Sequence, residues 1–420
     1  MRAWDCTSPP AVPATRPGLP RIHDTVTGRL LEVGPKSGAA RLYACGITPY
    51  DATHLGHAFT YVSVDLLHRV WLDAGLEVHY AQNVTDVDDP LLERAGATGV
   101  PWEQLASQQV ELFRADMAAL RVLPPRDYVG VVESLPDVVA LIQSMRATGT
   151  IYQVDDPEYP DWYFEVTQAP GFLDGLTMTP QGAEATFAER GGDPDRPGKR
   201  HPLDCLVWRM ARPGEPSWDT ALGRGRPGWH IECTAIALGA LGTTFDVQAG
   251  GSDLAFPHHP MCAAEALVAT GRPFAQAYLH TGMVALAGQK MSKSLGNLVF
   301  VRRLLDSGID PMSIRLALLS HHYHDDWEFT DQDLAGAQER LQRWRLAFSE
   351  PVGAPGLDVA DSVRAALRDN LDAPSALRLV DAWAASRGSD PAGPTLVATA
   401  VDALLGVAVG PRTPPGRLPR

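Results

Sequence analysis

The chain has 420 residues, of which 45% are hydrophobic and 20% are charged, so it is long enough for two or three domains around a large core. Its formal net charge of -14 at pH 7 argues against broad, sequence-independent contact with nucleic acid, because such contact needs lysine and arginine to displace counterions. Five scattered cysteines argue against a disulfide scaffold, and neither a signal peptide nor a roughly 18-residue apolar span is visible, so we expect a cytoplasmic protein with no membrane partner.

The first predicted elements form a β-α-β unit. Residues 40–46 are typical of a buried strand that runs into a glycine turn, and residues 57–72 carry apolar side chains at helical spacing. A second strand is predicted at residues 77–84. Because a strand, a glycine-containing turn, a helix and a strand within about forty residues are typical of a parallel sheet, we predict an α/β fold with a Rossmann-type core.

Weaker patterns follow along the chain. A helix is predicted at residues 101–120, where Pro101 suits the first turn, and a strand at residues 245–249. The irregular, proline- and glycine-rich stretch between them predicts an inserted α+β domain, and the chain beyond Pro311 is predicted to be helical. We therefore expect four parts: the first half of the Rossmann core (1–125), the inserted domain (126–216), the second half of the core with a lysine-bearing loop and a helical stem (217–345), and a small helical domain with a tail (346–420).

Two stretches have the residue types of a phosphate-binding site. His54 and His57 lie one turn apart at the start of the first predicted helix, where free N–H groups and the helix dipole attract anions. Lys290 and Lys293 lie in a loop bounded by glycines, where two cations beside hydroxyl groups can neutralise a triphosphate. Taken alone, each stretch is more often a solvated helix start or a solvated turn.

Together, the two stretches resemble the paired signature sequences of class I aminoacyl-tRNA synthetases, in the same order and on the same kinds of element. The resemblance implies that Mg-ATP is a substrate and that an aminoacyl adenylate is formed. His54, His57, Lys290 and Lys293 would then stabilise the phosphate during its transfer, when negative charge builds up on it.

A dispersed set of soft metal ligands comprises Cys45, Cys233 and His258. Thiolate and imidazole suit zinc, although any one of these residues alone is more often a buried core residue. The stretches around the three residues resemble cysteinyl-tRNA synthetase; they are residues 45–48, 228–233 and 250–259. The resemblance implies that the three residues bind Zn²⁺, which holds the substrate cysteine through its thiolate and rejects serine.

One position departs from the pattern of that family. In cysteinyl-tRNA synthetases a glutamate four residues after the ligating histidine completes the metal shell, and this chain has Cys262 at that position. Cys262 is either a fourth ligand or a packing residue beside a three-ligand site. We favour the packing role.

A fourth stretch, Glu189-Arg-Gly-Gly-Asp-Pro194, would by itself be a polar loop. With the zinc and phosphate signatures it resembles the cysteine ligases of mycothiol biosynthesis, which join cysteine to the amine of glucosaminyl-inositol. Further stretches fit the same family, namely residues 45–57, 83–90 and 211–218. The resemblance runs from about residue 20 to about residue 345 and continues more weakly beyond. It implies a monomer whose partners are the small molecules cysteine, ATP and glucosaminyl-inositol, with no nucleic acid.

The same resemblance implies a set of contacts with the cysteinyl adenylate and its precursors. Trp229 would form a wall of the cysteine pocket, and Asp253 would pair with the cysteine ammonium group. For Thr60 and Val284, a helix hydroxyl and a core side chain remain open alternatives. The implied binding residues are Cys45, Gly46, Ile47, Thr48, Thr60, Asn83, Val84, Thr85, Trp229, Gly251, Ser252, Asp253 and Val284.

We therefore expect a two-step reaction. The cysteine carboxylate attacks the α-phosphate of ATP to give cysteinyl-AMP and pyrophosphate, and the sugar amine then attacks the mixed anhydride and releases AMP; no general base is identified for the second step. The main alternative is cysteinyl-tRNA synthetase, against which stand the acidic charge, the stretch at 189–194 and the limited length after Pro351. A degenerate synthetase that only senses zinc or nucleotide should have lost the phosphate-site residues, which this chain retains.

Overall fold

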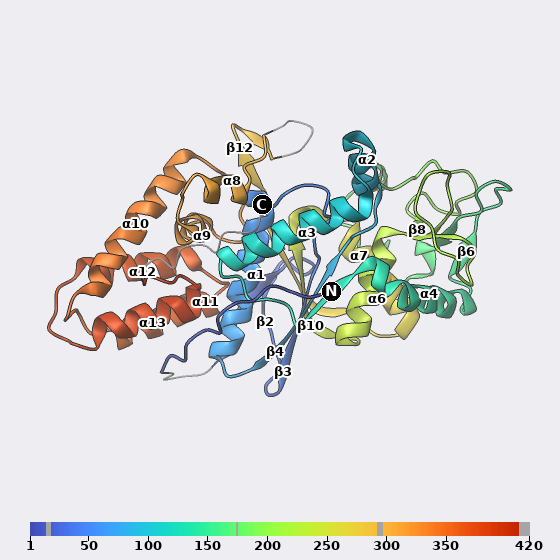
Figure 1. The fold of residues 1–420 in the computed structure, drawn as a ribbon. Helices are drawn as coiled ribbons and strands as arrows, with labels where there is room; N and C mark the ends of the chain where they lie inside the picture. The colour runs from blue at the N-terminus through green and yellow to red at the C-terminus, as the bar shows by residue number, and fades with distance from the viewer. Residues whose placement is uncertain (14–17, 174, 292–296, 411–420) are drawn as a thin grey trace.

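A five-stranded parallel sheet forms the centre of the protein (Figure 1). The structure, a computed structural model, describes residues 1–13, 18–173, 175–291 and 297–410. The strands lie in the order β11-β10-β3-β4-β5 and every neighbouring pair is parallel, which confirms the predicted α/β fold class. Their bounds are Ala39–Ala44 for β3, Glu77–Val84 for β4, Asp127–Gly130 for β5, Phe245–Gly251 for β10 and Ala275–Thr281 for β11.

Helix α1, Leu55–Asp73, follows β3 and corresponds to the helix predicted at residues 57–72. It packs against the sheet on one side and against C-terminal helices on the other. Most of its side chains are therefore buried, including the polar ones of Asp65, His68 and Arg69. A helix covered on several sides does not show the single apolar stripe of a surface helix.

Shorter elements complete the first half of the core. Helix α2 is Asp89–Thr98, and α3 is Trp102–Ala119, close to the predicted helix at residues 101–120. Strands β1, Arg21–Asp24, and β2, Arg29–Glu32, form an antiparallel hairpin that packs against β11. In Figure 1, α3 crosses in front of the sheet between α1 and α2.

After β5 the chain leaves the sheet and builds the inserted domain. It has an antiparallel sheet of order β6-β7-β8-β9, and the hydrophobic cluster around its Phe164 and Trp208 extends to Ile231 and Met261 in the second half of the core. Strand β5 pairs with β4 in the central sheet and β9 pairs with β8, so the sheets divide the chain somewhat later than the expected boundaries at 126 and 216. The bounds are Val131–Ala147 for α4, Ile151–Gln153 for β6, Trp162–Phe164 for β7, Val166–Gln168 for the 3₁₀ helix η1, Pro180–Glu189 for α5, Cys205–Met210 for β8 and Gly225–Pro227 for β9.

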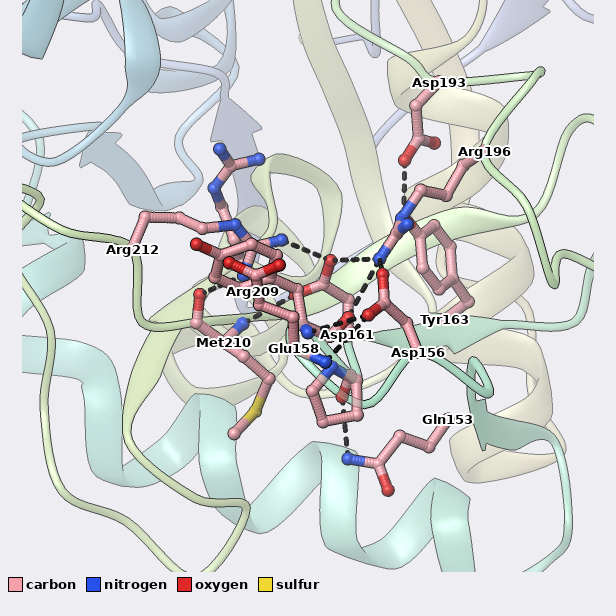
Figure 2. Close-up of polar contacts among 12 residues, drawn as sticks. Gln153, Asp156, Glu158, Asp161, Tyr163, Asp193, Arg196, Arg209, Met210 and Arg212 are labelled. Carbon is pink, nitrogen blue, oxygen red and sulfur yellow. Dashed lines mark hydrogen bonds and ion pairs between the residues drawn. The ribbon is translucent and has the colours of Figure 1, made fainter.

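Charged side chains hold the irregular loops of the inserted domain together. Arg196 lies between Asp156 and Asp161, at 2.9 Å and 3.4 Å, and Arg212 reaches Asp161 at 2.6 Å (Figure 2). Asp161 also accepts a hydrogen bond from the backbone N–H of Met210 at 2.8 Å. Because several charge-assisted bonds converge on one buried carboxylate, these loops are ordered despite a sequence without regular periodicity.

The second half of the core carries the remaining elements of the expected site. They are Trp229–Leu241 for α6, Ser252–Leu254 for the 3₁₀ helix η2, His258–Thr270 for α7, Val284–Leu286 for β12, Gln289–Lys290 for β13 and Trp327–Glu328 for β14. The helices that follow are Val301–Asp306 for α8, Pro311–Leu319 for α9, Asp331–Ser349 for α10, Leu357–Arg368 for α11, Ala373–Ala385 for α12 and Gly393–Leu405 for α13. Helix α10 crosses the expected boundary at 345. The four-part division of the chain stays a prediction. None of the described helices is long and apolar enough to span a membrane.

Two buried arginines fasten the last helix to α1. Asp65 of α1 pairs with Arg69 at 2.7 Å and with Arg315 of α9. Arg69 donates a hydrogen bond to the carbonyl oxygen of Asp402 at 3.1 Å, and Arg315 donates one to that of Leu405 at 2.7 Å. These carbonyls belong to the last turn of α13, and that of Asp402 also accepts a hydrogen bond from the N–H of Gly406 at 3.1 Å. The C-terminal helices are thereby tied to the helix that begins at the expected phosphate site.

Candidate active site

The three expected metal ligands come together at the carboxyl ends of the central strands. Cys45 directly follows β3, Cys233 lies in the second turn of α6, and His258 is the first residue of α7. Their ligand atoms all lie within 4.8 Å of one another, and all three residues are buried. Two sulfurs and one imidazole nitrogen are a donor set that suits zinc, and three protein ligands leave one position open. The residues therefore fit the metal that the sequence predicts.

The two cysteines of this cluster differ in their acidity. The hydrogen bond from the Cys45 thiol holds the pKa of Cys233 well below its usual range, and His258 acts in the same direction. Burial raises the pKa of the Cys45 thiol well above its usual range. Because the two thiols interact strongly, they titrate as one unit and not as two independent groups.

Neighbouring rings orient His258. Its Nδ1 lies 2.9 Å from Nδ1 of His230, and the Trp229 ring stacks on the His258 ring with centroids 4.3 Å apart. A second contact of this kind fixes which ring nitrogen of a histidine can bind a metal. The Cys262 sulfur lies 3.8 Å from His258 Nε2 and within hydrogen-bond distance of the His230 carbonyl, but Cys262 is not part of the three-residue cluster.

Two stacked histidine rings lie over the start of α1. His54 is the N-cap, and its Nδ1 accepts hydrogen bonds from the backbone N–H groups of Gly56 at 3.1 Å and His57 at 3.4 Å. The rings of His54 and His57 stack with centroids 3.8 Å apart. A Cβ on residue 56 would lie 2.9 Å from the His54 ring, so glycine is needed for that ring to fold over the helix start. Burial lowers the pKa of His57 to about 4, which makes this imidazole neutral at physiological pH.

The chain that follows the lysine loop is bonded to the same helix start. The N–H of Leu55 donates to the carbonyl of Val299 and the N–H of Val301 donates to that of Thr53, both at 2.9 Å. The backbone of Lys290 lies in β13, opposite Ala285 of β12. Lys293 lies outside the described residues. One end of the lysine-bearing segment is thus fixed beside His54.

The ends of β3 and β4 are joined by hydrogen bonds. The N–H of Gly46 donates to Asn83 Oδ1 at 2.7 Å, Asn83 Nδ2 donates to Thr85 Oγ1 at 3.1 Å, and the N–H of Thr85 donates to the carbonyl of Ile47 at 3.0 Å. Asn83, Val84 and Thr85 are buried. These bonds tie the two strand ends together, and Thr48 is partly exposed beside them.

Other expected binding residues lie at neighbouring strand ends. Gly251 is the last residue of β10, Ser252 and Asp253 follow it, and all three are partly exposed. Thr60 Oγ1 lies 2.8 Å from Oγ1 of Thr281, the last residue of β11. Val284 is only 2% exposed and belongs to the main core cluster, so a contact with adenine would come from its backbone rather than its side chain.

The structure adds residues that the sequence did not single out. The Cys45 sulfur lies 3.2 Å from Nε2 of His259, whose Nδ1 lies 2.7 Å from Nε2 of His280. His280 Nδ1 in turn lies 2.9 Å from Thr25 Oγ1. Burial lowers the pKa of His259 and His280, so this row of imidazoles is neutral. In the sequence, the position of His259 next to the expected ligand His258 could have indicated its place in the site. His280 is a lone histidine in a strand, and nothing in the sequence indicates its place there.

Comparisons with known proteins show the family to which the chain belongs. A family model described as the catalytic domain of class I (C) tRNA synthetases matches residues 33–339. A protein of Kribbella flavida named L-cysteine:1D-myo-inositol 2-amino-2-deoxy-alpha-D-glucopyranoside ligase is 57% identical over 409 residues, covering 97% of this chain and 100% of its own. Proteins of Thermobispora bispora and Streptomyces griseus with the same name are 56% and 55% identical, with the same coverage.

Solved structures share the fold at low sequence identity. The methionyl-tRNA synthetase of Mycobacterium tuberculosis in complex with methionyl-adenylate superimposes with a TM-score of 0.61 at 17% identity, covering 87% of this chain and 89% of that one. The leucyl-tRNA synthetase of Agrobacterium radiobacter K84 gives a TM-score of 0.60 at 11% identity, covering 89% and 83%. These similarities concern the fold alone.

Proposed function

The chain belongs to the class I aminoacyl-tRNA synthetase family and, within it, to the L-cysteine:1D-myo-inositol 2-amino-2-deoxy-alpha-D-glucopyranoside ligases, and we propose that it joins L-cysteine to the amine of that amino sugar using ATP. The observation that carries the proposal is the buried cluster of Cys45, Cys233 and His258 at the carboxyl edge of the sheet. In open α/β sheets ligands bind at this edge, and soft donors there select a substrate thiol.

We propose that the cluster holds one Zn²⁺ ion. Bound there, zinc would supply an open coordination position that prefers a thiolate, which distinguishes cysteine from serine. Trp229 covers the cluster through its stacking on His258, and Asp253 stands at the adjacent strand end, where its carboxylate suits the cysteine ammonium group.

The first chemical step is the formation of cysteinyl-AMP. A carboxylate oxygen of cysteine forms a bond to the α-phosphorus of Mg-ATP, and the bond from that phosphorus to the bridging oxygen breaks, releasing pyrophosphate. His54 and His57 lie at the start of α1, where the helix dipole favours a phosphate, and Lys290 and Lys293 would supply positive charge. Burial keeps His57 neutral, so its role is to donate a hydrogen bond rather than to carry charge.

The second step transfers the cysteinyl group to the amino sugar. The amine nitrogen forms a bond to the carbonyl carbon, the bond from that carbon to the phosphate oxygen breaks, and AMP leaves while the nitrogen loses a proton. The hydrogen bonds among Gly46, Asn83 and Thr85 would hold the backbone at the two strand ends in place to contact the adenylate. No residue is assigned as the base of this step.

Cysteinyl-tRNA synthetase, the alternative, is not favoured, because relatives matching 97% of this chain and the whole of their own length carry the name of the amino-sugar ligase. We also propose that the protein acts as a monomer in the cytoplasm, where ATP is available, without a nucleic-acid partner. The net charge of -14 supports the last point, since contact with a polyanion favours basic surfaces.

The test follows the fate of the activated cysteine. Zinc-loaded protein is incubated with ATP and cysteine, and glucosaminyl-inositol or total tRNA is then added in parallel, with AMP release measured and the products weighed by mass spectrometry. AMP release driven by the amino sugar, with a cysteinyl amide as product, supports the proposal. Acylated tRNA would overturn it in favour of the alternative, and adenylate formation with neither acceptor used would require a different amine.

A further inference from the structure

A single guanidinium joins the inserted domain to the loop that carries the cysteine-site residues. Arg190 follows α5 directly, and its Nη1 donates hydrogen bonds to the carbonyl oxygens of Asp253 and Phe256. One carbonyl belongs to η2, and the other belongs to the short segment that joins η2 to α7. The stretch from one carbonyl to the other begins at the proposed partner of the cysteine ammonium group and ends two residues before the proposed metal ligand His258.

The residues that follow Arg190 form a tight turn that holds its backbone in place. Gly191 has φ +87°, a left-handed conformation that terminates α5 and that L side chains rarely adopt. Gly192 lies against the ring of Phe187, where a Cβ would come within 2.5 Å of the ring atoms, and its N–H donates to the Phe187 carbonyl at 2.8 Å. Both glycines are therefore required for the chain to turn tightly at the end of α5.

Asp193 anchors this turn in the inserted domain. Its carboxylate accepts hydrogen bonds from the Tyr163 hydroxyl and, at 3.0 Å, from Lys199 Nζ; Figure 2 shows the Tyr163 contact. The Lys199 side chain is 2% exposed, and its Nζ lies 4.9 Å from the centre of the Phe187 ring and 5.4 Å from that of Tyr163. A buried ammonium with a carboxylate and two ring faces as partners is held firmly.

We propose that Arg190 is a positioning residue of the cysteine pocket, through which the inserted domain fixes the loop between Asp253 and His258. Arg190 makes this contact, and Gly191, Gly192 and Asp193 hold its backbone in place. The stretch from Glu189 to Pro194 therefore acts on the bound cysteine through the loop and does not touch the substrate. The inference rests on the proposed function, because that function assigns Asp253 and His258 to cysteine and to zinc.

The experiment compares Arg190→Ala and Arg190→Lys with the wild type in cysteine-dependent exchange of pyrophosphate into ATP. The expected result for Arg190→Ala is a rise in the KM for cysteine of about tenfold, the size expected when a charge-assisted hydrogen bond is lost, with the KM for ATP unchanged. Arg190→Lys should fall between the two, since an ammonium can still donate to a carbonyl. Arg200→Ala is the matched control, because Arg200 is an exposed arginine of the same domain that pairs with Glu165.

A second readout needs no catalysis. Hydrogen exchange of the peptide covering residues 251–257 should be faster in Arg190→Ala than in the wild type, and unchanged in Arg200→Ala. Equal rises in both KM values, or unchanged exchange in the loop, would overturn the inference. If the wild type forms no cysteinyl-AMP at all, the proposed function fails, but the hydrogen exchange of residues 251–257 still decides whether Arg190 holds the loop. If Arg190→Ala does not fold, Arg190→Lys is compared with the wild type in its place.

Discussion

The N–H of Gly46 donates a 2.7 Å hydrogen bond to Asn83 Oδ1, and a Cβ on residue 46 would lie only 1.6 Å from the carbonyl oxygen of Asn83. The two strand ends can approach this closely only because residue 46 has no side chain. The contact places the backbone after β3 against the end of β4, where the proposed adenylate lies.

Gly46→Ala is therefore expected to destabilise the protein by about 3 kcal/mol or more, the upper range for an overpacked site, and to abolish cysteine activation. Thermal unfolding and pyrophosphate exchange measure the two effects. Gly96→Ala is the control: Gly96 lies inside α2, and a Cβ added there would meet nothing within 4 Å, so alanine should be neutral or stabilise by about 0.5–1 kcal/mol. Similar behaviour of the two variants would contradict the role given to the Gly46 contact.

His57→Ala should lower kcat for cysteinyl-AMP formation by about 10²-fold, the effect of removing one donor from a developing charge, with little change in the KM for cysteine. His57→Asn, which keeps a neutral donor, should lose less. Because burial lowers the pKa of His57 to about 4, the wild-type rate should show no ionisation of this residue between about pH 6 and pH 8. If the wild-type rate shows an ionisation between pH 6 and pH 8 that is absent from His57→Asn, His57 is not neutral throughout this range and the prediction is wrong.

Lys293→Ala should slow adenylate formation far more than it weakens cysteine binding, by about 10²-fold in kcat, because a cation beside the phosphate acts mainly when negative charge builds up. Single-turnover formation of cysteinyl-AMP and equilibrium binding of cysteine separate the two quantities. Lys36→Ala, at an exposed lysine far from Lys293 in the sequence, controls for the loss of one positive charge. Equal losses in rate and binding would count against this role.

Cys233→Ser should remove the bound zinc, whereas Cys262→Ser should leave both the zinc content and the affinity for cysteine unchanged. Cys233 belongs to the cluster of ligand atoms within 4.8 Å of one another, and Cys262 does not. Metal analysis of the purified variants and calorimetric titration with cysteine measure the outcome. Loss of zinc from Cys262→Ser would make Cys262 a fourth ligand.

His68 should make the protein sensitive to acid. Burial lowers its pKa from 6.5 to about 4, and its Nδ1 has no hydrogen-bond partner in the structure. Between these two pH values the unfolded chain binds more protons than the folded one, so this contribution to stability is complete above about pH 6.5 and is lost as the pH falls toward 4.

The wild type should accordingly lose about 2 kcal/mol more unfolding free energy than His68→Leu between pH 7.5 and pH 5. Urea unfolding followed by circular dichroism at several pH values measures the difference. Parallel pH dependence of the wild type and His68→Leu would refute the prediction.

The local pattern of the chain was sufficient for the central elements and for the type of chemistry. Residues 77–84 were predicted as a strand and are β4, because Val78, Tyr80 and Val84 are residue types that favour strands. The histidine and lysine signatures and the scattered cysteines were visible for a similar reason: residue types with special chemistry stand out without any knowledge of the fold.

What only the tertiary structure decided depends on contacts between distant residues. The four-residue strand β5 is too short to show a period, and its place in the central sheet comes from pairing with β4. Cys45 and His258 are more than two hundred positions apart, so their meeting follows from the parallel order of β3 and β10. The hydrogen bonds from Arg190 to the carbonyls of Asp253 and Phe256 leave no trace in the sequence, because a backbone carbonyl is present at every residue and its partner is chosen by the fold alone.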